Sequence, residues 1–241
     1  MEIFYDKEKS AELEEKLIDK WFNTESVKGK YRIRREERVT KRGREFHISD
    51  VVCCPLQTYC RLKKFQRKFS KKNVGMMLFG IVAQKLFQWL YQDEECEYEA
   101  MIEDVVIGHI DVFEKLEYPM EIKASRKRIF KRNQIPQKWV EQLVCYMAMT
   151  SSKVGWMTIL NIFTCQVSCF CIKMTDEDIL GQLVVIAKTV NERRRAVNLD
   201  NPSMLRPSAE QYEFCVYKHN CPLRADCKHK FDVIQKRREK K

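Results

Sequence analysis

Three ionisable side chains stand at strand-like positions in the middle of the chain. Asp111 ends a Gly-His-Ile-Asp segment at 108–111, and Glu121 and Lys123 are two residues apart in a Glu-Ile-Lys sequence. Side chains alternate along a strand, so Glu121 and Lys123 are expected on one face about 7 Å apart, and a hairpin would bring Asp111 beside Glu121. Two adjacent carboxylates repel each other unless a cation lies between them, and oxygen ligands favour a hard ion such as Mg²⁺ or Mn²⁺.

Lys123 adds a positive charge to the metal site that the two carboxylates would form. Beside such a metal, Lys123 would orient an attacking water and offset the charge on a phosphate in the transition state, which is typical of phosphodiester hydrolysis. A surface Glu–Lys pair on an edge strand is the alternative, because a chain this charged contains several Glu-x-Lys sequences by chance. The setting favours function: the pair follows Asp111 by a hairpin's length and precedes a basic loop. The loop cations expected to contact DNA phosphates are Arg126, Lys127, Arg128, Lys131 and Arg132.

A helix predicted to open at Pro136 follows this loop. It carries Gln142 and Tyr146 four residues apart, and therefore on one face. Gln142 is placed to hold Lys123 or a nucleotide, and Tyr146 to contact a phosphate or stack on a base. Taken alone, Tyr146 is better explained as a core residue with a satisfied hydroxyl. Together with the strand pair, we favour the functional interpretation.

Apolar periodicity predicts the elements that position these residues. We expect helices over 6–23, 49–65, 76–91 and 136–150 and one that starts at Thr175, and strands over 98–103, 105–113, 119–124, 154–163 and 165–174. The helix over 76–91 is expected to be largely buried. The basic stretch 28–44 is expected to be an exposed loop or weak strand, and the tail over 236–241 to be disordered. The order predicts an α/β fold with a mixed central sheet flanked by helices.

The eleven cysteines form a second candidate site. The charged N-terminal segment is not typical of a secretory signal, so we expect metal ligands or buried thiols rather than a disulfide framework. Cys215, Cys221 and Cys227 are spaced Cys-x5-Cys-x5-Cys, and Cys54 is the best fourth ligand because, like Cys221, it precedes a proline. The adjacent Cys53 remains an alternative. Four thiolates suit a [4Fe–4S] cluster or a tetrahedral Zn²⁺, and the lack of Cys-x-x-Cys knuckles favours the cluster.

The order Gly-x-x-Asp, Glu-x-Lys, Gln-x-x-x-Tyr resembles the RecB-like branch of the PD-(D/E)XK nuclease superfamily. The segment 47–55 and the closing Cys-Pro-Leu-Arg-Ala-Asp-Cys at 221–227 resemble the CRISPR-associated RecB-like exonucleases of the Cas-four type, and the related iron–sulfur nuclease domain of AddB-type helicase–nucleases. The resemblance implies a nuclease core over 76–200. An N-terminal helix and basic segment over 1–47 and a helical segment with one cluster cysteine over 48–75 would precede it. A cysteine segment with a basic tail over 201–241 would follow, and an iron–sulfur module would join the two ends.

The resemblance also implies roles for individual residues. The implied catalytic set is Asp111, Glu121, Lys123, Gln142 and Tyr146. The implied metal ligands are Asp111, Glu121, the backbone carbonyl of Ile122, and Gln84, which stands where the family usually has a histidine. Glutamine still offers an oxygen, but it binds Mn²⁺ less well than imidazole does.

Composition limits the function classes. The 241 residues carry a net charge of +11 and are 44% hydrophobic, which excludes a wholly disordered chain and favours a polyanionic partner such as nucleic acid. No apolar run approaches the roughly 20 residues that cross a bilayer. We expect a cytoplasmic location.

We therefore predict a metal-dependent DNA exonuclease with a [4Fe–4S] cluster and Mg²⁺ or Mn²⁺. The resemblance implies single-stranded DNA as the preferred substrate, a role in CRISPR adaptation and the integrase complex as partner. The alternatives are a catalytically weak DNA-binding or adaptor subunit of the same fold, and a zinc-stapled repair nuclease outside CRISPR. Whether the protein forms a homo-oligomer is left open.

Overall fold

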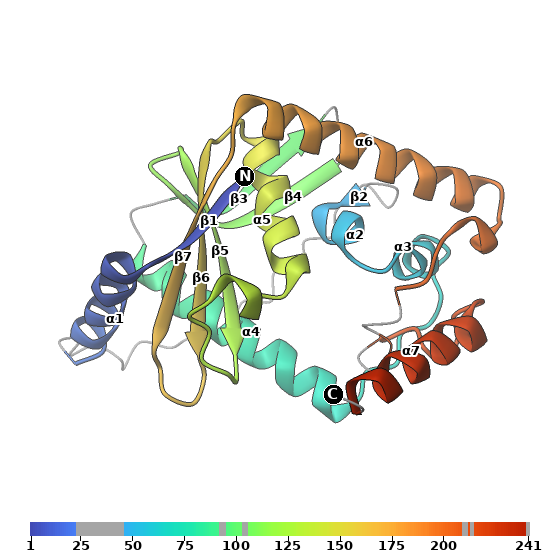
Figure 1. Cartoon of the computed structure of the whole chain (residues 1–241), viewed down its shortest axis with the longest axis horizontal. Coiled ribbons are helices and arrows are strands. Elements are labelled where there is room, and N and C mark those ends of the chain that lie inside the picture. The colour runs from blue at the N-terminus through green and yellow to red at the C-terminus, as the bar shows by residue number, and fades with distance from the viewer. Residues whose placement is uncertain (23–45, 92–94, 103–105, 209–211, 213–214, 240–241) are drawn as a thin grey trace.

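A computed structural model gives the fold of the chain (Figure 1). It describes residues 1–22, 46–91, 95–102, 106–208, 212 and 215–239. The basic stretch predicted over 28–44 lies outside the described residues. Within them, no helix combines the length and the apolar character needed to cross a bilayer.

The centre of the fold is a seven-stranded mixed sheet. Its strands are β1 (Glu2–Asp6), β2 (Phe46–His47), β3 (Glu95–Ile102), β4 (Val106–Glu114), β5 (Tyr118–Ser125), β6 (Val154–Asn161) and β7 (Val167–Lys173). Their order is β1-β7-β6-β5-β4-β2, with β3 also paired to β4. The β5–β6 and β2–β4 pairs are parallel and the others are antiparallel. The expected mixed sheet is confirmed, and the short edge strand β1 is an addition that sequence periodicity did not predict.

Helices flank this sheet. Those described are α1 (Lys7–Phe22), α2 (Ile48–Val52), α3 (Pro55–Leu62), α4 (Lys71–Leu90), α5 (Gln137–Met149), α6 (Asp176–Asn198) and α7 (Arg224–Glu239). The predicted start of α6 is confirmed: the Thr175 hydroxyl accepts a hydrogen bond from the Asp178 N–H, and the Asp178 carboxylate accepts one from the Thr175 N–H. This reciprocal cap satisfies two amide groups that the first helical turn leaves unpaired.

Both faces of the sheet are covered. On one face, Met147 of α5 packs in a cluster with Phe170 of β7. On the other, Phe87 of α4 packs with Met120 of β5 and Leu13 of α1. The central strands β4 and β5, which carry the predicted carboxylates and lysine, are therefore held inside a packed core.

A third cluster joins the early helical segment to the C-terminal end of the chain. Its buried members are Cys54, Leu56, Tyr59, Cys60, Ala196, Leu205 and Tyr217. Figure 1 shows α3 and α7 together on the side of the molecule opposite α1. The chain thus brings two cysteine-bearing segments together although they are far apart in sequence.

The single helix predicted over 49–65 was wrong in detail, because two helices, α2 and α3, meet at Cys53 and Cys54. Cys53 is extended (φ −82°, ψ 172°), and Cys54 is also outside the helical region (φ −51°, ψ 125°). Pro55 explains the break, since a residue before proline is driven out of the helical region and proline itself suits the first position of a helix.

The expectation that 76–91 is largely buried was wrong for the first half of α4. Six large apolar side chains there are 38–54% exposed: Met76, Met77, Leu78, Phe79, Ile81 and Val82. Ala83 and Phe87 are fully buried. Only the second half of α4 lies against the sheet, while the first half extends beyond it (Figure 1).

The tail also differs from expectation. It was predicted to be disordered over 236–241, but α7 continues to Glu239, and the last two residues lie outside the described part. Lys, Arg, Gln and Glu have high helix propensity, so a basic sequence of this kind extends a helix that has already started.

Candidate active site

Asp111 and Glu121 come from neighbouring antiparallel strands. Backbone pairing joins Val112–Glu114 of β4 to 118–120 of β5, and Asp111 and Glu121 are the next residues along the two strands. There the Asp111 Oδ2 accepts a hydrogen bond from the backbone N–H of Ile122 at 2.8 Å. Asp111 thus contacts the residue next to Glu121, and Lys123 feels the negative charge of both carboxylates.

Glu121 is deeply buried, with 2% of its side chain exposed. Its Oε1 accepts a hydrogen bond from Lys123 Nζ. Its Oε2 is buried and has no hydrogen-bond partner among the described residues. Burial raises the pKa of Glu121 above its ordinary value, and the Lys123 ammonium opposes that rise. A buried carboxylate oxygen in this state needs a cation or a hydrogen-bond donor that the described residues do not supply.

Lys123 lies between the carboxylates and helix α5. Besides its contact with Glu121, its Nζ donates to Gln142 Oε1 at 3.1 Å. Burial lowers the pKa of Lys123, but the negative charges of Glu121 and Asp111 more than compensate, so the pKa is raised overall. Lys123 is therefore a fixed positive charge at neutral pH.

Gln142 and Tyr146 continue this hydrogen-bonded chain along α5. Gln142 Nε2 donates to Tyr146 Oη at 2.9 Å. Tyr146 is 3% exposed, and burial raises its pKa well above the ordinary value, so its phenol stays protonated. The ring lies against Gly108, where an added Cβ would come within 2.8 Å of Tyr146 Cε1. Glycine at 108 is what allows this close approach of α5 to β4.

On the other face of the sheet, α4 reaches the site through Gln88. The side chain of Gln88 is buried, and its Nε2 donates to the backbone oxygen of Asp111 at 3.3 Å. Its Oε1 accepts from Lys85 Nζ at 2.8 Å. Gln84, the predicted metal ligand, is half-buried one turn earlier. Gln88 was not predicted from the sequence, although its spacing of four residues from Gln84 places both on one helix face.

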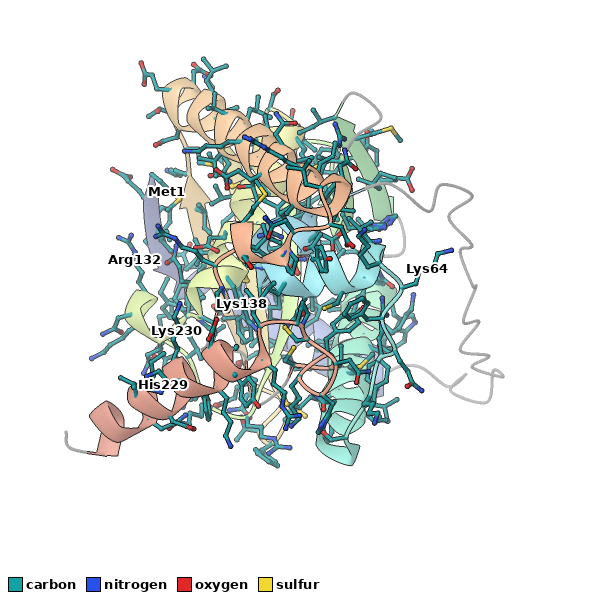
Figure 2. All side chains as sticks on the ribbon, turned by 90° about the vertical axis from the view of Figure 1, so that its right-hand side faces the viewer. Met1, Lys64, Arg132, Lys138, His229 and Lys230 are labelled. Atoms are coloured by element: carbon teal, nitrogen blue, oxygen red, sulfur yellow. The ribbon has the colours of Figure 1, made fainter. Side chains whose placement is uncertain are left out.

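The predicted DNA-contacting cations follow β5 directly. All five are exposed, and the Arg128 guanidinium lies 4.0 Å from the centre of the Phe130 ring. Lys131 and Arg132 line an open hollow that also contains Gln137. Figure 2 shows Arg132, Lys138 and Lys230 on one face of the molecule. The loop thus adds exposed positive charge close to the end of the strand that carries Glu121 and Lys123.

The structure also gathers the four cysteines predicted as cluster ligands. Cys54, Cys215, Cys221 and Cys227 line one small cavity of about 10 Å³. Cys54 comes from the junction of α2 and α3, and Cys227 from the start of α7. Main-chain amides point at three of the sulfurs: Ser208 N–H donates to Cys54 Sγ at 3.3 Å, Tyr217 N–H to Cys215, and Leu223 N–H to Cys221. Such bonds favour the thiolate form and are a feature of iron–sulfur sites.

Cys60 is a fifth thiol in this group, and it was not predicted as a ligand from the sequence. It is fully buried and hydrogen-bonded to Cys221, which lowers the pKa of Cys221 to about 7 and raises the pKa of Cys60. A sequence signal for it existed, because Cys54 and Cys60 repeat the Cys-x5-Cys spacing of the C-terminal set.

Among the described residues, no three His, Cys, Asp or Glu side chains are already arranged to hold a metal ion. The chemistry of the two donor sets nevertheless fits the expected groups. Two carboxylates, one with an unpartnered buried oxygen, suit Mg²⁺ or Mn²⁺, because such ions keep several waters and need few protein ligands. Four thiols, three of them with amide donors, suit a [4Fe–4S] cluster or Zn²⁺.

Comparison with known proteins finds similar solved structures. No protein-family model matches the sequence, and no curated protein matches it. The solved structures that resemble this chain include three proteins. The protein SSO0001 is 16% identical with a TM-score of 0.49, over 75% of this chain and 87% of its own. An alkaline exonuclease from Laribacter hongkongensis is 12% identical with a TM-score of 0.47, over 66% and 93%. A phage-related exonuclease from Haemophilus somnus 129PT is 8% identical with a TM-score of 0.45, over 65% and 96%.

Proposed function

We propose that this protein is a metal-dependent deoxyribonuclease that hydrolyses phosphodiester bonds. The proposal is supported by the contacts of Asp111 with the Ile122 N–H and of Glu121 with Lys123 on the same strand, and by Glu121 Oε2, which is buried and lacks a partner within the described chain. A structural ion pair would not need the second carboxylate or leave an oxygen unsatisfied. The exposed cations that follow β5 supply a path for the phosphates of a nucleic acid.

Each side chain has a distinct role in this reaction. Asp111, Glu121, the carbonyl of Ile122 and Gln84 would hold Mg²⁺ or Mn²⁺, which supplies Lewis-acid activation of water and phosphate when bound. Lys123 orients the attacking water and offsets the charge that develops on the phosphate. Gln142 fixes Lys123 through the bond to its Nζ, and Tyr146 fixes Gln142. This chain limits the freedom of the lysine before substrate arrives.

The finer assignments rest on the sequence motifs and on the cysteine cavity. We propose exonucleolytic cleavage with single-stranded DNA as the preferred substrate. We also propose a [4Fe–4S] cluster held by Cys54, Cys215, Cys221 and Cys227, and a role in CRISPR adaptation beside the integrase complex. Support for the cluster comes from the common cavity and from the amide donors. The CRISPR role is supported only by the resemblance of the cysteine motifs.

A DNA-binding subunit without turnover is the second candidate. Gln84 favours it, because an amide oxygen replaces the imidazole expected at that position and weakens the hold on Mn²⁺. Such a protein would bind single-stranded DNA through the same basic loop and leave it intact.

Cleavage of end-labelled single-stranded DNA by anaerobically purified protein separates the candidates. We expect cleavage with Mn²⁺ or Mg²⁺ and none with EDTA. Asp111→Asn should be slower by about 100-fold or more. Asp176→Asn, which changes a carboxylate that is 73% exposed, should match the wild type. If the protein binds the DNA but does not cleave it with any divalent ion, it is the DNA-binding subunit. Full cleavage in EDTA would refute the metal-dependent mechanism.

A further inference from the structure

Arg193 is a buried cation in the middle of α6. It is 4% exposed. Its guanidinium donates to Thr58 Oγ1 at 2.9 Å, to the carbonyl of Val51 at 2.9 Å and to the carbonyl of Cys53 at 3.0 Å. These three acceptors lie on both sides of the break between α2 and α3, so Arg193 fastens that junction to α6.

All of these acceptors are neutral. The nearby carboxylate of Asp50 is engaged elsewhere, because Arg61 donates to its Oδ1 at 3.0 Å and to its Oδ2 at 2.6 Å. In the described part of the chain, no carboxylate forms an ion pair with Arg193. Burial lowers the pKa of Arg193, and the charges of Asp50, Cys53 and Cys54 oppose this. Because the nearby Asp50 carboxylate is bound by Arg61, a further anion is expected close to the buried Arg193 guanidinium.

The cysteine cavity is the place where that anion would lie. The Cys53 carbonyl that Arg193 contacts belongs to the peptide bond leading into Cys54, whose side chain lines the cavity. Ala196, three residues after Arg193, is fully buried in the same cluster as Cys54 and Cys60. Figure 1 shows α6 running from the sheet toward the end of the molecule that contains α3.

We propose that Arg193 is the internal counter-cation of the metal–thiolate group bound in this cavity. The proposal rests on the iron–sulfur cluster proposed above. Four thiolates outweigh the positive charge of an oxidised [4Fe–4S] core, so the assembled group is anionic, whereas an empty set of protonated thiols is neutral. Arg193 therefore favours the loaded state over the empty one. It also favours the reduced, more negative cluster, and so raises its reduction potential.

Three variants separate charge from hydrogen bonding. Arg193→Gln removes the charge and keeps polar contacts, while Arg193→Lys keeps the charge and loses the three-way hydrogen bonding. Arg195→Gln removes an exposed cation from the same helix and serves as the control. On anaerobically purified full-length proteins, iron and sulfide per chain, the rate of iron loss to a chelator, and the reduction potential are measured. We expect Arg193→Gln to lose iron several-fold faster and to have a lower potential. Arg193→Lys and Arg195→Gln should keep the wild-type potential.

Each other outcome has a defined meaning. Unchanged iron loss and potential in Arg193→Gln would overturn the counter-cation role while leaving the cluster in place. A potential in Arg193→Lys as low as in Arg193→Gln would also overturn it, because hydrogen bonding would then explain the effect. If Arg193→Gln fails to fold, a lowered potential in Arg193→Lys still overturns the role. If the wild-type protein holds zinc, the rate of zinc loss to a chelator is measured in place of iron loss, since a zinc tetrathiolate is also anionic. A wild type with neither metal refutes both the cluster and its counter-cation.

Discussion

The Asp111 carboxylate accepts a hydrogen bond from the backbone N–H of Ile122, with 2.8 Å between Oδ2 and N. One proposed metal ligand thus anchors itself on the strand that carries the other. The contact lies beside Val112 and Met120, where the two strands are joined by backbone pairing. The Asp111 side chain therefore extends the hydrogen bonding between β4 and β5 beyond the backbone pairs. The positions of the two carboxylates thus depend on the backbone of the sheet and not on a mobile loop.

Lys123 is predicted to matter for both stability and turnover. Lys123→Met leaves the Glu121 carboxylate buried without its ammonium, which should lower the free energy of unfolding by about 3 kcal/mol at neutral pH and abolish cleavage. Adding Glu121→Gln should recover much of the stability and none of the activity. Urea unfolding of the single and double variants measures the coupling. Additive effects on the free energy of unfolding would show that the pair is not coupled.

Gly108→Ala is predicted to disturb the site by displacing the ring of Tyr146. The new Cβ would lie 2.8 Å from Tyr146 Cε1 and 3.1 Å from Met149 Sδ, so the Tyr146 ring must shift and Gln142 must follow. We expect a loss of about 1–3 kcal/mol in the free energy of unfolding together with slower cleavage. In Gly181→Ala, on α6, the added Cβ meets nothing within 4 Å, and this variant should be neutral or more stable by up to about 1 kcal/mol. Equal melting temperatures for the two variants would contradict the close contact.

The metal requirement provides a test of Gln84. Gln84→His should lower the Mn²⁺ concentration needed for half-maximal cleavage by several-fold, because imidazole binds Mn²⁺ better than an amide does. Gln66→His, at an exposed site on the chain between α3 and α4, is the matched control and should leave the metal requirement unchanged. If both variants titrate like the wild type, Gln84 does not contact the metal.

The raised pKa of Tyr59 predicts how the stability of the protein changes at alkaline pH. Burial, followed by the hydrogen bond to Asp200 Oδ1 at 2.7 Å, raises its pKa to about 12. A raised acid pKa means that the folded state holds the proton more tightly, so this stabilisation is complete below pH 10 and disappears as the pH rises toward 12. Tyr59→Phe should be less stable by about 1 kcal/mol at pH 7, and the difference should shrink above pH 10. Thermal melts of both proteins over this pH range measure it, and a constant difference up to pH 12 would contradict the assignment.

The parts of the site that could be predicted from the sequence depend on local geometry. Alternation along β5 determines that Glu121 and Lys123 share a face, and helical spacing determines the same for Gln142 and Tyr146. The break at Cys54 was also visible in Pro55, but the apolar pattern on both sides suggested one continuous helix.

The remaining features depend on how distant segments meet. The exposure of Met77 could not be predicted, because an apolar sequence indicates a tendency to be buried but not whether another element covers it. Cys60 and Arg193 gain their significance only when α6 and the C-terminal segment pack on α3. Gln88 likewise matters because α4 crosses β4 at Asp111.

The most direct test of the central claim is the single-turnover rate of Glu121→Gln on single-stranded DNA at saturating Mn²⁺. The substitution keeps the shape of the side chain and an oxygen for Lys123 but removes the charge that would hold the metal. We predict a rate lower than wild type by about 100-fold or more in a variant that remains folded. A rate within about two-fold of wild type would contradict the assignment of Glu121 and, with it, the carboxylate–lysine site as the source of catalysis.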